Sequence, residues 1–236
     1  MKLSFKGERV LAVVAHPDDA ELLCAGTLAR AKRDRAAIAV CVLCHGDKGQ
    51  PEKTIANLAA VRRKEMAVSA EMLGAQLFLG GHPDGTLEDS QPQRLELVEV
   101  YRRFKPTLLL AHAPEDYHPD HRAASALAEA ASWFSASRGH RTGSAALARP
   151  PALWWMDTLS MHGFTPGFFI DISDLVGLKT RMLACHQSQL RRGRDGDFAP
   201  LAEVMQLQFR ARGAQAGVKA AEAFRAHLAF KRARAW

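Results

Sequence analysis

Short apolar runs alternate with helix-forming segments along most of the chain, and this alternation constrains the fold more than any other feature. The expected strands are residues 10–15, 38–43, 76–79, 107–111, 153–156 and 168–172. The expected helices are residues 20–33, 55–73, 93–104, 121–135 and 175–186. Strands that alternate with helices favour a mostly parallel sheet with helices on both faces. We therefore predict one α/β domain over residues 1–236, built on a Rossmann-like sheet.

Two similar clusters of His and Asp follow two of these expected strands. The first reads Ala15-His-Pro-Asp-Asp-Ala-Glu21, and the second, a short loop after residues 107–111, reads His118-Pro-Asp-His121. Ligands of open parallel sheets collect beyond the carboxyl ends of the strands, so both clusters should open on one edge. His nitrogens and Asp oxygens suit zinc and similar divalent ions. The sequence thus predicts a catalytic metal site at the carboxyl ends of the strands, and a metal-dependent hydrolase.

The local sequence indicates how each cluster is presented. In the first cluster His16 and Asp19 can converge from a strand-to-helix turn, which leaves the carboxylate of Asp18 adjacent but free. A free carboxylate beside a metal is suited to act as a general base. In the second cluster a proline is well placed for a first helical turn, so His118 and His121 should share one face of it. One of them can bind metal while the other stands beside it.

Composition and charge argue against several other classes of protein. The chain is 47% hydrophobic and 24% charged, as in ordinary globular proteins. Its apolar runs fall short of the roughly 20 residues of a membrane span, and the first is too short for a signal peptide, so we expect a cytoplasmic protein without a membrane partner. Residues 190–236 carry ten Lys or Arg against four Asp or Glu. We expect this basic part to be helical and to belong to the same domain, with no nucleic-acid partner, because it has no interleaved aromatic platform.

The chain has four cysteines, two of which form a Cys-x-x-Cys pattern. Cys41 and Cys44 both lie in the run Ile38-Ala-Val-Cys-Val-Leu-Cys44, which we interpret as a buried strand. Residues three apart on a strand point to opposite faces, so the two thiols should not converge on a metal. We interpret them as packed core thiols.

The two His-Asp clusters resemble the motifs of the PIG-L/LmbE-like zinc-dependent N-deacetylases, which act on N-acetylglucosamine-containing molecules. The resemblance covers most of the chain. It extends to Arg62-Arg-Lys-Glu65, Leu73-Gly74, Pro83-Asp84-Gly85, His186-Gln-Ser-Gln189 and Gly217-Val-Lys-Ala-Ala-Glu-Ala-Phe224. The last two segments are similar to the bacillithiol-biosynthesis type in particular. Two positions depart from the family pattern, since Tyr117 stands where a basic residue often precedes the second motif and Ala220 replaces the usual tyrosine.

The resemblance implies a role for each residue of the two motifs. The zinc ligands would be His16, Asp19 and His121. Asp18 would be the general base that activates the attacking water, and His118 would stabilise the oxyanion or protonate the leaving amine. Asp120 would orient a histidine from outside the ligand set. Another divalent transition metal can replace zinc with such ligands.

Two further residues are candidates for substrate binding. Arg62 and Asp84 can contact sugar hydroxyls, or they can simply form ion pairs near the rim of the site. Arg62 and Glu65 are three apart on an expected helix, where an ordinary ion pair is common.

The resemblance thus implies removal of an N-acetyl group from an amino sugar or its conjugate, which releases acetate and a free amine. The alternative is a metal-dependent amidase or hydrolase of another small acylated or thiol-conjugated substrate. By analogy with the family, we also expect a homo-oligomer, a trimer or a hexamer.

Overall fold

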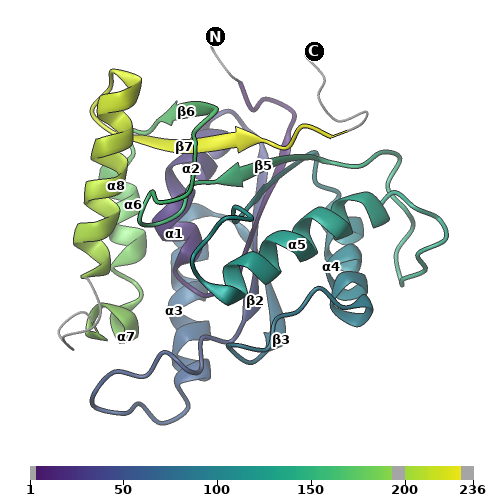
Figure 1. The fold of residues 1–236 in the computed structure, drawn as a ribbon, viewed down its shortest axis with the longest axis horizontal. Coiled ribbons are helices and arrows are strands. Elements are labelled where there is room, and N and C mark those ends of the chain that lie inside the picture. Colours follow the sequence, from purple (N-terminus) through teal and green to yellow (C-terminus); the bar gives the residue numbers. More distant parts are fainter. Residues whose placement is uncertain (1–3, 193–199, 230–236) are drawn as a thin grey trace.

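A seven-stranded sheet in the order β3-β2-β1-β4-β5-β7-β6 crosses the centre of the molecule (Figure 1). The structure is a computed structural model and describes residues 4–192 and 200–229. The strands are β1 (Arg9–Val14), β2 (Ala37–Cys44), β3 (Gln76–His82), β4 (Leu108–Ala111), β5 (Ala152–Met156), β6 (Phe168–Asp171) and β7 (Ala221–Ala226). All six expected strands are present, and β7 is a strand that the sequence pattern did not indicate.

The direction of the strands fixes where a ligand can bind. The five strands β3, β2, β1, β4 and β5 are parallel to one another, and only β7 runs antiparallel to its neighbours β5 and β6. The prediction of a mostly parallel sheet is therefore confirmed. The strand order reverses between β1 and β4, and the crevice at the carboxyl ends of such a strand pair is the usual place for a ligand. The two His-Asp clusters follow these two strands.

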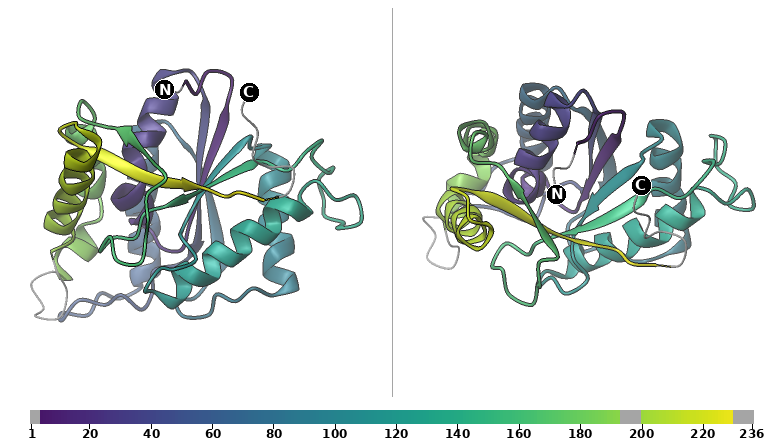
Figure 2. Two further views of the ribbon diagram at one scale, coloured as in Figure 1. Left: turned by 45° about the horizontal axis from the view of Figure 1, so that its top comes forward. Right: turned by 90° about the horizontal axis from the view of Figure 1, so that it is seen from above.

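Helices cover both faces of the sheet, as the views in Figure 2 show. They are α1 (Asp19–Leu23), α2 (Ala25–Arg33), α3 (Leu58–Leu73), α4 (Gln91–Phe104), α5 (Pro119–Phe134), α6 (Val176–Leu183), α7 (Gln187–Leu190) and α8 (Leu201–Ala216). Helices α4 and α5 lie on one face, and the others gather on the opposite face. Among the described residues, none of these helices is both long and apolar enough to span a membrane.

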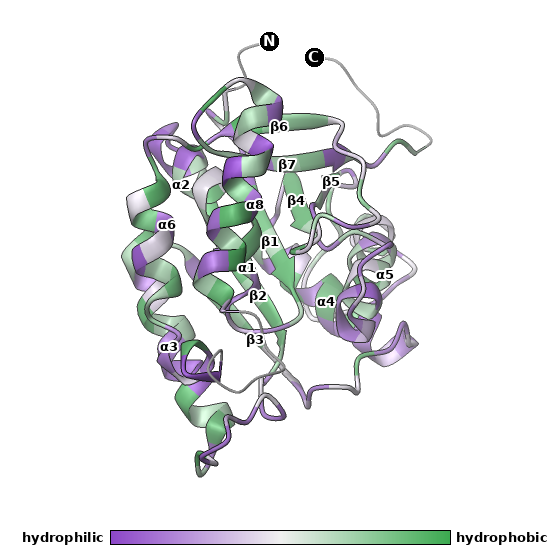
Figure 3. Ribbon diagram, turned by 60° about the vertical axis from the view of Figure 1, so that its left-hand side comes forward, coloured by the Kyte–Doolittle hydropathy of each residue, from purple (hydrophilic) through white to green (hydrophobic). Residues whose placement is uncertain are grey.

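The core has two halves because alternate residues of each strand face opposite sides of the sheet. In β1, Val10 and Val14 pack toward α1, α2 and α3, whereas Leu11 and Val13 pack toward α4 and α5. The central strands are apolar on both faces, which Figure 3 shows as continuous green ribbons beneath helices of mixed colour. This burial on both faces is typical of parallel sheets. It holds the ends of β1 and β4 in fixed positions.

Three details differ from the sequence-based expectation. The expected helix 20–33 is broken at Cys24, whose φ of −145° separates α1 from α2. The expected helix 55–73 begins only at Leu58, because Asn57 caps it with a side chain that accepts a hydrogen bond from the Ala60 amide. The C-terminal part is helical in α8, but it also contributes β7 to the sheet. Of residues 190–236, positions 193–199 and 230–236 lie outside the described residues.

Cys41 and Cys44 are free thiols buried in the core, as expected. They do not alternate as in a regular strand, because the pairing of β2 with β3 shifts between Val42 and Cys44. Both cysteines therefore belong to the apolar cluster on the α4 and α5 side.

Candidate active site

The first cluster forms a tight turn between β1 and α1. The backbone amide of His16 donates to Asp19 Oδ2 over 2.7 Å, and the Asp19 amide donates back to the His16 carbonyl. Asp18 adopts a left-handed backbone conformation with φ of 108°, which is uncommon outside glycine but better tolerated by Asp and Asn. The turn thus places His16, Asp18 and Asp19 together at the carboxyl edge of the sheet.

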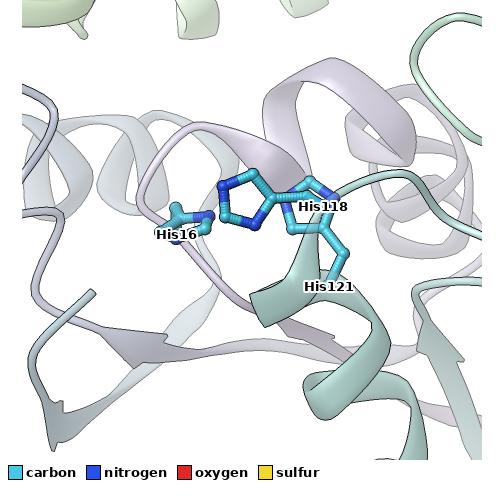
Figure 4. Close-up of side chains that lie close together, drawn as sticks. All are labelled: His16, His118 and His121. Carbon is cyan, nitrogen blue, oxygen red and sulfur yellow. The ribbon is translucent and has the colours of Figure 1, made fainter. Parts of the chain in front are cut away.

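The second cluster opens helix α5. His118 is the residue before the helix, and its Nδ1 accepts a hydrogen bond from the Asp120 amide over 3.1 Å. Pro119 occupies the first helical turn, as the sequence predicts, and His121 follows within that turn. Figure 4 shows the rings of His118 and His121 at the start of this helix, beside the ring of His16.

The structure brings the three residues expected to bind metal close together. Asp19 Oδ2 lies 3.5 Å from His16 Nδ1, and Asp19 Oδ1 lies 3.3 Å from His121 Nε2. Two overlapping groups also have ligand atoms within 4.8 Å of one another, namely His16 with His118 and His121, and Asp19 with His112 and His121. The cluster is thus a possible metal-binding site with more than one set of donors.

Carboxylates stand behind both histidines of the expected ligand set. Asp120 Oδ2 lies 3.1 Å from His16 Nε2, and Asp116 Oδ1 lies 3.0 Å from His121 Nδ1. Metal-binding histidines almost always have such a partner on the far nitrogen, because it fixes the ring and its tautomer. With these partners, Nδ1 of His16 and Nε2 of His121 are the nitrogens that face Asp19. The donors therefore fit a divalent metal ion.

The electrostatic environment favours positive charge at the same place. Burial lowers the pKa of His16, but the hydrogen bonds with Asp120 and Asp19 outweigh burial and raise that pKa to about 9. Burial acts in the same way on His121, where Asp19 and Asp116 raise the pKa to about 10. The carboxylates around both rings thus give the site negative charge, which favours a bound cation.

His118 differs from the other two histidines. Because its Nδ1 accepts the Asp120 amide hydrogen, the proton of the neutral ring is on Nε2. Burial, together with the charges of His121 and His16, also lowers the pKa of His118. The ring is therefore a neutral hydrogen-bond donor at Nε2.

Asp18 lies beside the candidate metal-binding cluster and faces an arginine. Arg62 Nη2 is 3.0 Å from Asp18 Oδ2, and the same guanidinium donates to the carbonyls of Pro17 and Gly46. Burial raises the pKa of Asp18 above the usual carboxyl range, and the charge of Arg62 opposes this rise. A carboxylate whose pKa is raised toward neutrality is well suited to accept and return a proton.

The two residues expected to contact substrate line the pocket but also hold its walls together. Arg62 does not pair with Glu65, which instead accepts hydrogen bonds from the amide and hydroxyl of Ser188. Asp84 accepts from the amides of Gly46 and Lys48 over 2.7 and 3.0 Å. The immediate partners of Arg62 and Asp84 are therefore other parts of the site.

The cluster opens into a cavity of about 490 Å³. Residues from both motifs line it, and so do Lys48, Gln189 and Arg192. Leucine side chains, among them Leu22, and the ring of Tyr117 complete the lining. Such a cavity accommodates a small molecule with both polar and apolar surface.

Two residues of the site were not singled out as part of the metal cluster by sequence reasoning. His112, which directly follows an expected strand, is fully buried, lies 3.2 Å from Asp19 Oδ2 and stacks on His121 with ring centroids 4.0 Å apart. Asp116, which stands behind His121, also accepts from the His118 amide. Its signal in the sequence was an acidic residue two positions before the second motif.

Comparisons with known proteins identify the family to which the chain belongs. The GlcNAc-PI de-N-acetylase family, PIG-L, matches residues 11–132, more than half of the chain. The diacetylchitobiose deacetylase of Thermococcus kodakarensis is 29% identical over 189 residues, which cover 77% of this chain and 70% of that protein. The 4-oxalmesaconate hydratase of Pseudomonas putida is 27% identical over 188 residues, which cover 76% of this chain and 73% of that protein.

A solved structure extends the similarity over almost the whole chain. The conserved protein TT1542 from Thermus thermophilus is 33% identical and superposes with a TM-score of 0.78. The match covers 97% of this chain and 100% of that one.

The sheet and the His and carboxylate cluster at its carboxyl edge define an α/β enzyme with a candidate metal centre. The chain belongs to the PIG-L family of de-N-acetylases. It is accordingly an enzyme of the hydrolytic N-deacetylase class.

Proposed function

We propose that the protein is a zinc-dependent hydrolase that removes the N-acetyl group from an N-acetylglucosamine-type amino sugar or its conjugate. The observation that carries the proposal is the position of Asp18. This carboxylate is buried beside the histidine cluster, burial raises its pKa, and the charge of Arg62 opposes that rise. Amide hydrolysis needs such a base next to a metal. The deacetylase relative supports the substrate class.

In this proposal His16, Asp19 and His121 hold the metal. When bound, zinc would polarise the amide carbonyl and lower the pKa of water. Asp120 and Asp116 orient the two histidine ligands from behind, because each carboxylate lies within 3.1 Å of the far nitrogen. The assignment of zinc follows from the donor set, which other divalent transition metals can also occupy.

The remaining residues carry the proton transfers. Asp18 accepts a proton from the attacking water as the tetrahedral species forms. His118 points its Nε2 hydrogen toward the developing oxyanion, where a fixed neutral donor stabilises negative charge. The proton held by Asp18 is then available to the leaving amine, so that acetate and a free amine result.

The test is acetate release by zinc-loaded and metal-stripped protein. The substrates are free N-acetylglucosamine, its malate and inositol conjugates, and a chito-oligosaccharide. We expect zinc-dependent release from one of them. Failure of all four with zinc bound would overturn the substrate class. It would favour the alternative, a hydrolase of another small acylated or thiol-conjugated compound.

The hydratase relative provides a second candidate reaction. The 27% identity to 4-oxalmesaconate hydratase indicates that related chains carry out more than one type of reaction. Incubation with 4-oxalmesaconate, with its ultraviolet absorbance recorded over time, distinguishes hydration from deacetylation. Hydration without any acetate release would replace deacetylation as the proposed reaction.

Asp116 provides a test of the metal site. We expect Asp116→Ala to weaken zinc binding about 10–100-fold, because His121 loses the carboxylate that fixes its ring. Competition with a chelating dye measures the dissociation constant. Glu115→Ala is the matched control, since it removes the same charge from the neighbouring residue, whose carboxylate pairs with Arg225 on the surface. Equal zinc affinities of the two variants would contradict the role of Asp116.

Arg62 provides a test of the base through the pH profile. The guanidinium lowers the pKa of Asp18, so its removal in Arg62→Gln raises that pKa further. Asp18 is then protonated at a higher pH, and activity is lost sooner as the pH falls. We expect the acidic limb of kcat/KM to move to higher pH, and Arg62→Lys, which keeps the charge, to move it less. An unchanged acidic limb in Arg62→Gln would show that the ionisation of Asp18 does not set that limb.

A cytoplasmic location and assembly into a homo-oligomer, a trimer or a hexamer, remain predictions from the sequence. Size-exclusion chromatography with light scattering measures the second directly.

A further inference from the structure

Cys44 lies at the carboxyl end of β2, next to the turn that carries the first cluster. Its amide donates to the carbonyl of Ala15 over 2.8 Å, which fixes the cysteine beside His16. The side chain is only 3% exposed. The proposed deacetylation gives this thiol no role.

Three potential ligand atoms meet at this place. The sulfur of Cys44, a ring nitrogen of His16 and a carboxylate oxygen of Asp120 all lie within 4.8 Å of one another. Among the residues that the structure describes, Cys44 is the only cysteine in such a group. Thiolate, imidazole and carboxylate together suit zinc and softer divalent ions.

The ring of His16 separates this group from the proposed catalytic metal. Its Nδ1 lies 3.5 Å from Asp19 Oδ2, whereas its Nε2 lies 3.1 Å from Asp120 Oδ2 on the other side. The ring therefore has donors for an ion at each nitrogen. One set contains Asp19 and His121, and the other contains Asp120 and Cys44.

We propose that Cys44, His16 Nε2 and Asp120 form a second ion site, which binds a thiophilic divalent ion such as cadmium, or zinc in excess, and inhibits the enzyme. The incoming ion replaces the thiol proton of Cys44 and the Nε2 proton of His16, and both protons pass to solvent. No electron transfer is involved. His16 then binds one ion through each ring nitrogen.

The second ion inhibits because it removes the contact that orients His16. Asp120 Oδ2 holds both His16 Nε2 and the amide of Gly85, over 3.1 and 2.8 Å. An ion on Asp120 breaks the contact that orients His16 and places another positive charge beside the catalytic site. Hard ions such as magnesium prefer oxygen ligands and should not compete for the thiol. Burial also raises the pKa of Cys44 well above its usual range, so the thiol is not a nucleophile by itself.

The experiment titrates zinc-loaded protein with cadmium chloride while the thiolate-to-cadmium charge-transfer absorbance is recorded. We expect the band to reach its full height at about one cadmium ion per chain, as at structural thiolate sites. Acetate release should be lost in parallel with the growth of the band. In Cys44→Ser the band should be absent, and half-inhibition should need at least about tenfold more cadmium, relative to that variant's own basal rate. Cys185→Ser, which removes the more accessible thiol, is the matched control and should behave as the wild type.

Two results would overturn the proposal. One is a band that persists in Cys44→Ser and disappears in Cys185→Ser. The other is an X-ray absorption spectrum of cadmium bound to the wild-type protein that shows only nitrogen and oxygen ligands. This measurement does not depend on how the variant folds. The absorbance is read without substrate, so failure of acetate release in every sample would count against the proposed function and not against the second site.

Discussion

Asp18→Asn is expected to lower kcat by about 10²–10⁴-fold while zinc remains bound. The substitution removes the proton acceptor but preserves the shape of the side chain. Asn also tolerates the left-handed backbone of this position, where φ is 108°, better than most residues do. The amide oxygen can still accept a hydrogen bond from Arg62, which lies 3.0 Å from the carboxylate in the wild type. The loss should therefore report on chemistry and not on folding.

The measurements are kcat and KM for the substrate identified in the acetate assay, together with the zinc content of each purified variant. Asp19→Asn is the matched comparison, because it makes the same chemical change one residue later, at a proposed metal ligand. We expect Asp19→Asn to lose zinc affinity, whereas Asp18→Asn retains it. Near-normal turnover by Asp18→Asn would exclude Asp18 as the base.

The outline of the fold and the position of the cluster could be predicted from the sequence because both depend on local patterns. The apolar runs that become β1 and β4 are short and strand-forming, and each is followed by a His-Asp cluster. Parallel strands place such clusters on one edge without any further information. This is why His16, Asp19 and His121 come together in the structure.

Contacts between distant segments could not be predicted in the same way. Helical spacing suggested Glu65 as a partner of Arg62, but its carboxylate partner is Asp18, from the turn after β1. The helix only brings Arg62 near the turn, and the packing of α3 against the sheet decides which carboxylate it meets. Asp116 is a similar case, because its role depends on how the loop after β4 leads into α5.

Strand β7 shows how tertiary structure overrides local propensity. Its sequence, Ala-Glu-Ala-Phe-Arg-Ala, consists mostly of good helix formers. The segment nevertheless pairs with β5 and β6, and Phe224 and Ala221 are buried there. The glutamate of this strand, Glu222, is also buried, which is rare for a charged side chain without a partner. Its partners come from two other elements.

Glu222 joins β7 to helices α2 and α6. Its carboxylate accepts hydrogen bonds from the amides of Gly26 and Thr27 over 2.9 and 2.7 Å, at the start of α2. Lys179 of α6 donates to the same carboxylate over 2.6 Å and to the carbonyl of Leu22 over 2.9 Å. Both charged side chains are almost completely buried. Removal of either charge would leave the other without compensation in the core.

We expect Glu222→Gln to lower the free energy of unfolding by about 3–5 kcal/mol, because the positive charge of Lys179 then lies buried and unpaired. Denaturant unfolding measures the difference. The matched control is Glu115→Gln, which neutralises the carboxylate of an exposed ion pair with Arg225 and should change stability by no more than about 1 kcal/mol. The double variant Lys179→Met with Glu222→Gln removes the buried charge altogether and should recover part of the loss. If Glu222→Gln proved as stable as Glu115→Gln, the buried pair would not be what fixes β7 against α2 and α6.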